Sequence, residues 1–545
     1  MKNIISIVTA MKSILPILLT LLTIGFTGYS QPLQIDWQNC FGGEHDDDGE
    51  DMLYTGDGIL VTGYSEGDTW LFKIDTLGNV LWEKDLNDTI TAGAGRILKS
   101  ADGHYFIVAQ TGSEIEEIVN NPSSGSNFLI IKIDSSANIL WEHTFGGSSW
   151  DDIRDAVATY DGGVVVAGNT LSNDGDITKS FGSWDSWIIK VDKNGQKVWD
   201  FTMGTSGGEF SNGIIETSDH GLLVAITSII NLGGNIYCDQ SIGNYDVVLF
   251  KLDSTGKVEW HRCYGGSDAE SASTLIETDD GYLIASSGSS DDGDLTGSGY
   301  HYGYDYFYDN TSDVWLARID YSGNIIWQKC YGGTNHEWPR RIFHSEDGGF
   351  VVFSVSSSQD GDVFGNHSQD INNYNVWVIA ISRNGELLWQ QCIGGSDEDI
   401  QSAVQVSESE YVVIADVSYG PRGDITCDQY GNQDAWLFKV TNTMVGIEDH
   451  SASGSFFKVY PNPANDYVVF EVNGSEKYQR LMQMQKGPLM ISITDMFGRL
   501  ITEFPVQGEK TVWDARGIQP GVYSYGIRNP GIISNGKIIV GIAGQ

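Results

Sequence analysis

The stretch that decides the fold is Asp185-Ser-Trp-Ile-Ile-Lys-Val-Asp-Lys-Asn-Gly-Gln-Lys-Val-Trp199. Two short apolar strands are joined here by a tight turn. The residues upstream, from Asp151 to Gly168, read as two more strands around an Asp161-Gly-Gly turn, since glycine accepts the positive φ of a tight hairpin. Together the two stretches predict one four-stranded antiparallel unit with a polar loop between its second and third strands.

This unit repeats along the chain, and each copy is marked by its closing tryptophan and by a turn acid. The tryptophans are Trp37, Trp82, Trp141, Trp199, Trp260, Trp327 and Trp389. The turn acids are Asp57, Asp102, Asp161, Asp219, Asp280, Asp347 and Glu408. The tryptophans are 45 to 67 residues apart, which suits one four-stranded propeller blade with variable loops. The sequence therefore predicts an all-β protein with a seven-bladed β-propeller over residues 31–440.

The repeat count predicts how the ring closes. The last copy ends at Lys439-Val440 without a fourth strand, whereas the first copy is preceded by an extra one, Leu33-Gln-Ile-Asp-Trp37. We expect this N-terminal strand to complete the seventh blade and so to remove the exposed edges of the ring. The alternative is an open array.

The turn Leu252-Asp-Ser-Thr-Gly-Lys-Val-Glu-Trp260 resembles the tryptophan-docking repeat of quinoprotein propellers. The resemblance implies that each tryptophan packs between neighbouring blades. It is a scaffold resemblance only, because this chain lacks the eighth blade and the adjacent cysteine pair found at the quinone of those enzymes. We therefore expect no quinone cofactor.

Composition and the N-terminus limit the environment of the protein. The 545 residues include 73 acidic and 31 basic side chains, a net charge of −42, which argues against nucleic acid and anionic membranes as partners. Lys2 and Lys12 precede an apolar stretch that ends near Phe26, followed by small residues, so residues 1–30 are expected to form a secretory signal peptide. No later segment is apolar enough to span a membrane. We expect a soluble monomer outside the cytoplasm.

The C-terminal part has a different pattern. A polar linker is predicted over residues 441–455, and residues 456–545 alternate as a small immunoglobulin-like β-sandwich. Three motifs occur in order: Val459-Tyr-Pro-Asn-Pro, Asp495-Met-Phe-Gly-Arg499 and Gly521-Val-Tyr. Together they resemble the type A C-terminal sorting domain of the type IX secretion system. That resemblance implies export through the periplasm by the type IX machinery, ending in secretion or display on the outer cell surface.

Function is expected on the face that carries the long loops and the connections between blades, because these can vary without disturbing the ring. The most asymmetric feature is a tyrosine-rich loop in blade five, and tyrosines on exposed loops supply flat surfaces for sugars or protein partners. The alternative is packing on a neighbouring blade. Candidate ligand-binding residues are Tyr300, Tyr302, Tyr304, Tyr306, Tyr308, Trp150, Trp184 and Trp338.

Acidic residues form two recurring patterns on the same face. Ten positions before each turn acid lie Asp47, Ala92, Asp151, Glu209, Glu270, Glu337 and Glu398. These carboxylates either form a cation site at the channel mouth or accept hydrogen bonds from a neighbouring Gly-Gly turn. An Asp-Gly-Asp motif in three long loops offers candidate Ca²⁺ ligands, or else self-bonded turns. Its acids are Asp174, Asp176, Asp292, Asp294, Asp360 and Asp362.

The cysteines occupy two kinds of position. Cys40, Cys263, Cys330 and Cys392 each follow the closing tryptophan by three residues and are expected to be buried small residues. Cys238 and Cys427 share a Cys-Asp-Gln loop motif, and with these spacings we expect no disulfide framework.

The sequence favours a binding or adhesion module for a glycan or protein over a catalyst. It contains no Ser-His-Asp order, no His-Glu-x-x-His and no phosphate loop, so no catalytic residue and no cofactor beyond Ca²⁺ is assigned. The alternatives are an extracellular enzyme acting on polysaccharide and a structural surface component.

Overall fold

The computed structural model describes residues 32–65, 68–85, 94–111, 125–229, 234–238, 243–305, 309–367, 373–395, 397–418, 420–442, 457–460, 467–472, 490–495, 500–506, 510–516, 518, 521–529 and 532–540. Nearly all of them lie in strands, turns or connecting loops. The chain divides into two compact units, of which Pro32–Thr443 is the larger. Within the described ranges, no helix has the length and apolarity needed to cross a membrane.

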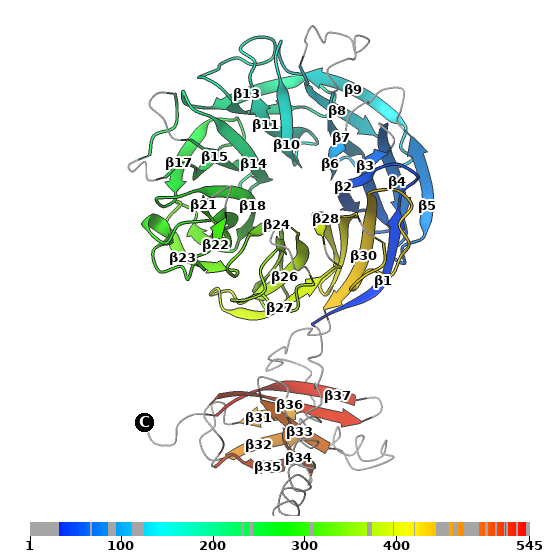
Figure 1. The fold of residues 1–545 in the computed structure, drawn as a ribbon, viewed down its shortest axis with the longest axis vertical. Coiled ribbons are helices and arrows are strands. Elements are labelled where there is room, and N and C mark those ends of the chain that lie inside the picture. The colour runs from blue at the N-terminus through cyan, green and yellow to red at the C-terminus, as the bar shows by residue number, and fades with distance from the viewer. Residues whose placement is uncertain are drawn as a thin grey trace, which may run out of the picture. The chain divides into compact units, whose positions relative to one another are not determined.

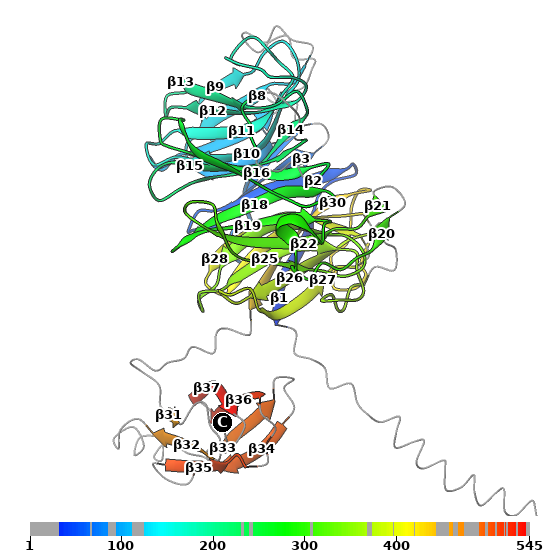
Figure 2. The same ribbon diagram turned by 90° about the vertical axis from the view of Figure 1, so that its left-hand side faces the viewer.

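The larger unit is a ring of seven four-stranded antiparallel sheets, as Figure 1 shows face-on and Figure 2 on edge. Blade one consists of β2 (Asp47–Tyr54), β3 (Ile59–Ser65), β4 (Asp68–Ile74) and β5 (Val80–Asp85). Blade two consists of β6 (Ala94–Lys99), β7 (Tyr105–Gln110), β8 (Phe128–Ile133) and β9 (Ile139–Phe145). Blade three consists of β10 (Asp151–Ala158), β11 (Val164–Thr170), β12 (Asp185–Val191) and β13 (Lys197–Met203). Blade four consists of β14 (Glu209–Glu216), β15 (Leu222–Ser228), β16 (Asp246–Leu252) and β17 (Val258–Tyr264). The seven-bladed propeller is therefore confirmed.

Blades five and six follow the same order from the centre outward. They contain β18 (Glu270–Thr278), β19 (Gly281–Gly288), β22 (Asp313–Asp320) and β23 (Ile325–Tyr331), and then β24 (Glu337–His344), β25 (Phe350–Ser356), β26 (Asn375–Ile381) and β27 (Leu387–Ile393). The long loop of blade five also carries the 3-10 turn η1 (Gly293–Leu295) and the short pair β20 (Tyr304–Asp305) and β21 (Asp309–Asn310).

Blade seven is assembled from both ends of the propeller sequence. Its strands are β28 (Glu398–Ser407), β29 (Glu410–Val417), β30 (Asp434–Asn442) and, at the outer edge, β1 (Leu33–Phe41). Strand β1 pairs antiparallel with β30, from Leu33 opposite Asn442 to Phe41 opposite Ala435. In Figure 1 the blue β1 lies beside the yellow β30, so the predicted closure of the ring by the N-terminal strand is confirmed. This pairing covers the edge that β30 would otherwise expose.

The cores lie between neighbouring blades. In blade three, every residue of β11 and β12 is buried, which explains their nearly continuous apolar sequences. Phe106 and Phe128 of blade two join Val166 and Trp187 of blade three in one buried cluster. Because each blade packs its apolar faces against the next, the ring buries a continuous core.

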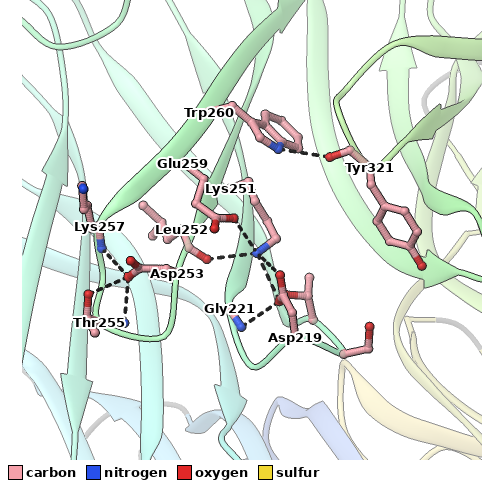
Figure 3. A network of polar contacts seen from close by, with 12 residues as sticks. Asp219, Gly221, Lys251, Leu252, Asp253, Thr255, Lys257, Glu259, Trp260 and Tyr321 are labelled. Carbon is pink, nitrogen blue, oxygen red and sulfur yellow. Dashed lines mark hydrogen bonds and ion pairs between the residues drawn. The ribbon is translucent and has the colours of Figure 1, made fainter.

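The turn face repeats a second set of contacts, shown for blade four in Figure 3. The Lys251 ammonium bonds the turn acid Asp219 at 3.0 Å, and the Trp260 indole N–H donates to the carbonyl of Tyr321 in the next blade at 3.1 Å. In the tight turn of the same blade, a side chain at Gly256 would collide with the ring of Trp199 in blade three, so this turn needs a glycine, which also has a φ of +83°. The repeated tryptophans and turn residues thus fasten blade to blade.

The expectation of no disulfides is wrong. Cys238 bonds to Cys263, and Cys40 bonds to Cys427, whereas Cys330 and Cys392 are free and buried as expected. In each bridge, the loop between the second and third strands returns to the outermost strand of its own blade. Cys40 and Cys263 occupy equivalent outer-strand positions that are too far apart to bridge, but their partners lie in loops whose paths the strand pattern does not determine. The Cys40–Cys427 bond links residues 387 positions apart and fastens β1 to blade seven covalently.

The smaller unit contains two antiparallel sheets (Figure 2). One has the order β31 (Phe457–Tyr460), β32 (Tyr467–Val472) and β35 (Lys510–Asp514). The other has the order β34 (Leu500–Pro505), β33 (Met490–Asp495), β36 (Gly521–Asn529) and β37 (Ile532–Val540). Phe470 and Trp513 of the first sheet share a core with Ile491, Tyr525 and Ile538 of the second. The immunoglobulin-like description of this unit stays a prediction.

Candidate functional site

The repeated carboxylates at the starts of the inner strands are buried, and they hold the connections between blades. Asp151 is fully buried, and its carboxylate accepts hydrogen bonds from the Gly147 amide at 2.7 Å and from the Ser172 hydroxyl at 3.1 Å. The other five described members of this carboxylate column, Asp47, Glu209, Glu270, Glu337 and Glu398, accept in the same way from an amide three or four residues upstream. The turn-bonding interpretation is confirmed for all six; Ala92 lies outside the described residues.

The six Asp-Gly-Asp acids make hydrogen bonds of a similar kind. Asp174 accepts from the Ser148 amide at 2.8 Å, and Asp176 accepts from the Gly146 amide at 3.2 Å. The acids of the two other motifs, Asp292 and Asp294, and Asp360 and Asp362, accept from the corresponding amides of their own blades. Among the described residues, no group of three or more His, Cys, Asp or Glu is arranged to hold a metal ion. The structure gives these acids a loop-docking role, and calcium binding by them stays a prediction.

Every inner strand shifts its register by one residue at the same place. The shift lies between the third and fifth residues of β10, and the corresponding positions of the six other inner strands behave alike. A bulge of this kind takes one residue out of the ladder and re-aims its side chain. The seven residues set free, here called the bulge column, are Glu50, Gly95, Arg154, Asn212, Ser273, Arg340 and Gln401.

The bulge column lines a cavity in the middle of the ring. This channel cavity has a volume of about 560 Å³, and all seven members of the column contribute to its wall. A second cavity of about 550 Å³, here called the mouth cavity, is lined from the loop face by Asn244, Tyr245, Asn310 and His336 among others. Six residues line both cavities and form the junction between them: Arg154, Ser211, Asn212, Ser271, Ser287 and Trp338.

The junction is held in place by packing and hydrogen bonds. The Trp338 indole N–H donates to the Ser312 hydroxyl at 3.1 Å, and its ring stacks on Tyr374 with centroids 4.9 Å apart. In blade four, the Thr227 hydroxyl donates to the Asn212 amide oxygen at 2.9 Å. An aromatic ring, amides and hydroxyls therefore converge in one recess, which is how small-ligand sites obtain both affinity and orientation.

An ionic network includes several residues that line the channel cavity. Arg96 contacts Asp51 at 3.2 Å and Asp155 at 2.8 Å, and Arg341 reaches Asp51 at 3.4 Å. Burial alone would raise the pKa of Asp51, but these two arginines hold it below its usual value. Glu50 behaves oppositely, since burial and the charges of neighbouring acids raise its pKa to about 7. The cavity thus combines fixed charges with one carboxyl group that titrates near neutrality.

The aromatic residues predicted to bind a ligand do not all lie at the cavities. Trp338 lines both cavities, while Trp150 and Trp184 line neither; Trp150 is 47% exposed. Tyr300 packs against the core of blade five and donates to the Thr311 carbonyl at 2.6 Å, whereas Tyr302 is 68% exposed. Tyr304 begins β20, and Tyr306 and Tyr308 lie outside the described residues.

Sequence reasoning missed the bulge column, although a signal was present. Each member lies seven residues before a turn acid, in a strand whose other positions repeat closely. The column contains acidic, basic, small and amide side chains, so it varies where its neighbours do not. Variation inside a repeated element was the sign that these residues serve something other than the ring.

Comparison with known proteins characterises the C-terminal unit. Residues 458–541 match the family described as "Secretion system C-terminal sorting domain". The C-terminal unit is a type IX sorting domain. Type IX export therefore brings the protein to the cell surface or the exterior, where the propeller meets its surroundings.

Other similarities are weaker. A segment is 24% identical over 224 residues to "Regulatory protein FlaEY" of Caulobacter vibrioides, covering 38% of this chain and 23% of that protein. Among solved structures, an apocarotenoid oxygenase of Synechocystis shares 11% identity, with a TM-score of 0.37, over 64% of this chain and 72% of the other. A structure of Drosophila Plexin A in complex with Semaphorin 1b shares 9% identity, with a TM-score of 0.39, over 75% and 87%. Scores this low support no inference about ligand or activity.

Proposed function

We propose that this exported propeller is a glycan-binding module whose ligand enters the mouth cavity and reaches the junction. The observation that carries the proposal is the composition of that recess, where Trp338 stands among the hydroxyl and amide groups of Ser271, Ser287 and Asn212. Aromatic faces stack on the apolar faces of sugar rings, and hydroxyls and amides pair with sugar hydroxyls.

The placement of Trp338 supports this reading. Its hydrogen bond to Ser312 and its stacking on Tyr374 fix the ring before any ligand arrives. A pre-positioned aromatic ring loses little conformational freedom on binding, so more of the contact energy becomes affinity. The exposed Tyr302 and the partly exposed Tyr245 extend polar aromatic surface on the loop face, and we include them as outer contacts.

The test is a glycan array followed by calorimetry on the full chain. Trp338→Ala is expected to weaken binding of the best glycan about tenfold or more, since it removes a central aromatic contact. Tyr430→Ala is the control, because Tyr430 is an exposed aromatic residue between β29 and β30 that lines neither cavity.

Two results would count against the proposal. An array on which no glycan binds, with a protein ligand captured at the mouth instead, would replace the ligand class. Unchanged affinity in Trp338→Ala would move the site away from the junction. Product release from labelled polysaccharide would favour an enzyme acting at the same recess.

A further inference from the structure

We propose that the glycan carries an acidic group, a carboxylate or a sulfate, and that the Arg154 guanidinium binds this group at the junction. This inference rests on the proposed function and specifies the chemistry of its ligand. Arg154 is suited to the role because it is the bulge residue of β10 and lines both cavities.

Four arginines line the channel cavity, and three of them are already paired. The propeller contains eight arginines in all: Arg96, Arg154, Arg262, Arg318, Arg340, Arg341, Arg383 and Arg422. Arg96 and Arg341 are balanced by Asp51 and Asp155, while Arg340 contacts Asp399 at 2.9 Å. Half of the propeller's arginines therefore gather on one cavity of a strongly acidic chain, and nearby carboxylates compensate three of these four.

Arg154 differs from the other three. Its side chain is exposed to the cavity, and within the described part of the chain it makes no hydrogen bond or ion pair. An unpaired guanidinium in a recess presents its whole fork of N–H donors to a ligand, and this fork matches the two oxygens of a carboxylate or sulfate.

The surrounding wall suits the remainder of such a ligand. Asn212, Ser211 and Ser271 lie at the same junction and offer neutral donors and acceptors rather than competing carboxylates. Asp155, which lines the channel cavity, and Asp51 are both engaged by Arg96. Glu50 also lines the channel cavity, and burial keeps its pKa high, so at neutral pH it is only partly ionised. Among the described residues at the junction, an incoming anion therefore meets the unpaired Arg154 and no carboxylate, while Asp268 lines the mouth cavity farther along its wall.

The experiment compares matched ligands on the full chain by calorimetry. The probes are uronic-acid tetrasaccharides, their carboxyl-reduced neutral counterparts and their sulfated counterparts. Wild type is expected to bind an acidic form about tenfold or more tightly than its neutral form, and Arg154→Gln is expected to remove that preference. Arg262→Gln is the control with the same charge change, since Arg262 lies exposed on β17 away from the cavities.

The outcomes separate this inference from the proposed function. The tighter of the carboxylated and sulfated probes identifies the acidic group, and either result supports the assignment of Arg154. Equal binding of acidic and neutral glycans, or an unchanged preference in Arg154→Gln, overturns the inference while leaving glycan binding through Trp338 in place. Absence of binding by every probe and by every glycan on the array overturns both.

Discussion

The first residue of an inner strand and the residue three positions later have opposite roles in the seven blades. On β10, Asp151 is buried and accepts hydrogen bonds from the turn beside it, whereas Arg154 projects from a bulge into the cavity without a partner among the described residues. The first position is a carboxylate in six of seven copies; the second differs in almost every copy. Repetition marks the residues that build the ring, and irregularity marks those that face the channel cavity.

The largest effect on stability is expected when the two positions are substituted separately in the same strand, β10. Asp151→Ala leaves the Gly147 amide and the Ser172 hydroxyl without their buried acceptor, which should lower the free energy of unfolding by about 2–4 kcal/mol. Arg154→Gln, three residues away, should change it by less than about 0.5 kcal/mol. Denaturant unfolding followed by tryptophan fluorescence measures both, since 15 of the 16 tryptophans lie in the propeller. Equal losses in the two variants would show that the two columns do not differ in kind.

A smaller effect is expected at one position where blades five and six carry different residues beside a buried glutamate. In blade six, the Asn375 amide donates to the Glu398 carboxylate at 2.8 Å. In blade five, the corresponding residue is Asp313, which faces Glu337 across Gly332. Burial, together with the charge of Asp313, raises the pKa of Glu337 to about 8. The blade-five pair therefore places two carboxyl groups where blade six places a hydrogen bond.

The sign of the resulting pH dependence follows from linkage. The unfolded chain releases the Glu337 proton near the ordinary value of 4.5, but the native state retains it up to about 8, so stability falls as pH rises between these values. Asp313→Asn supplies the donor found in blade six and should make this fall shallower, with a gain of about 1–2 kcal/mol above pH 8. Melting temperatures from pH 5 to pH 9 test it.

The reverse exchange serves as the control. Asn375→Asp should steepen the decline of stability with pH by giving blade six the carboxyl pair of blade five. Near and below neutral pH, Asp313→Asn should lose part of its gain, because Asp313 also accepts from the His301 ring at 2.9 Å and raises the pKa of that imidazole. Parallel melting profiles for wild type and both variants would mean that the paired carboxyl groups do not control this pH range.

The sequence was sufficient for the scaffold because the scaffold is periodic. Trp260, Asp219 and Lys251 recur with their partners in most blades, so one copy predicts the others, and the unmatched strand at Leu33 predicts the closure. The disulfides were missed because Cys238 and Cys427 lie in loops whose paths no strand pattern determines. Side chains in a regular strand alternate between its two faces, and a bulge interrupts this alternation. A prediction that assumes regular alternation therefore assigns the bulge residue to the wrong face.

The same limits explain which site residues were found. Trp338 was identified because it is an extra tryptophan, outside the positions where tryptophan repeats. Arg154 was not, because arginine inside an apparently regular strand reads as a solvent-facing residue. Only the shift between Ile153 and Asp155 shows that this side chain turns toward the channel, and a register shift depends on hydrogen bonding between strands rather than on residue type.

The smallest expected effect concerns Glu50, the bulge residue of β2. Its pKa of about 7 means that it is mostly protonated at pH 6 and mostly ionised above pH 8. Asp48, Asp51 and Asp416 interact with it electrostatically, and the charged residues that line the same cavity are Arg96, Arg154, Asp155, Arg340 and Arg341. Ionisation of Glu50 adds a negative charge to the cavity that holds Arg154, so affinity for an acidic glycan should fall about two- to fivefold from pH 6 to pH 8.5.

Glu50→Gln isolates this carboxyl group, because it keeps the shape of the side chain and removes its ionisation. The variant should bind the acidic tetrasaccharide with nearly constant affinity over the same pH range, and the neutral tetrasaccharide should show no pH dependence with either protein. Calorimetry at matched ionic strength provides the measurement, since screening changes alone would alter the affinity. If Glu50→Gln retained the decline seen in wild type, another member of the network would be the titrating group, and the bulge column would act on the ligand through Arg154 without Glu50.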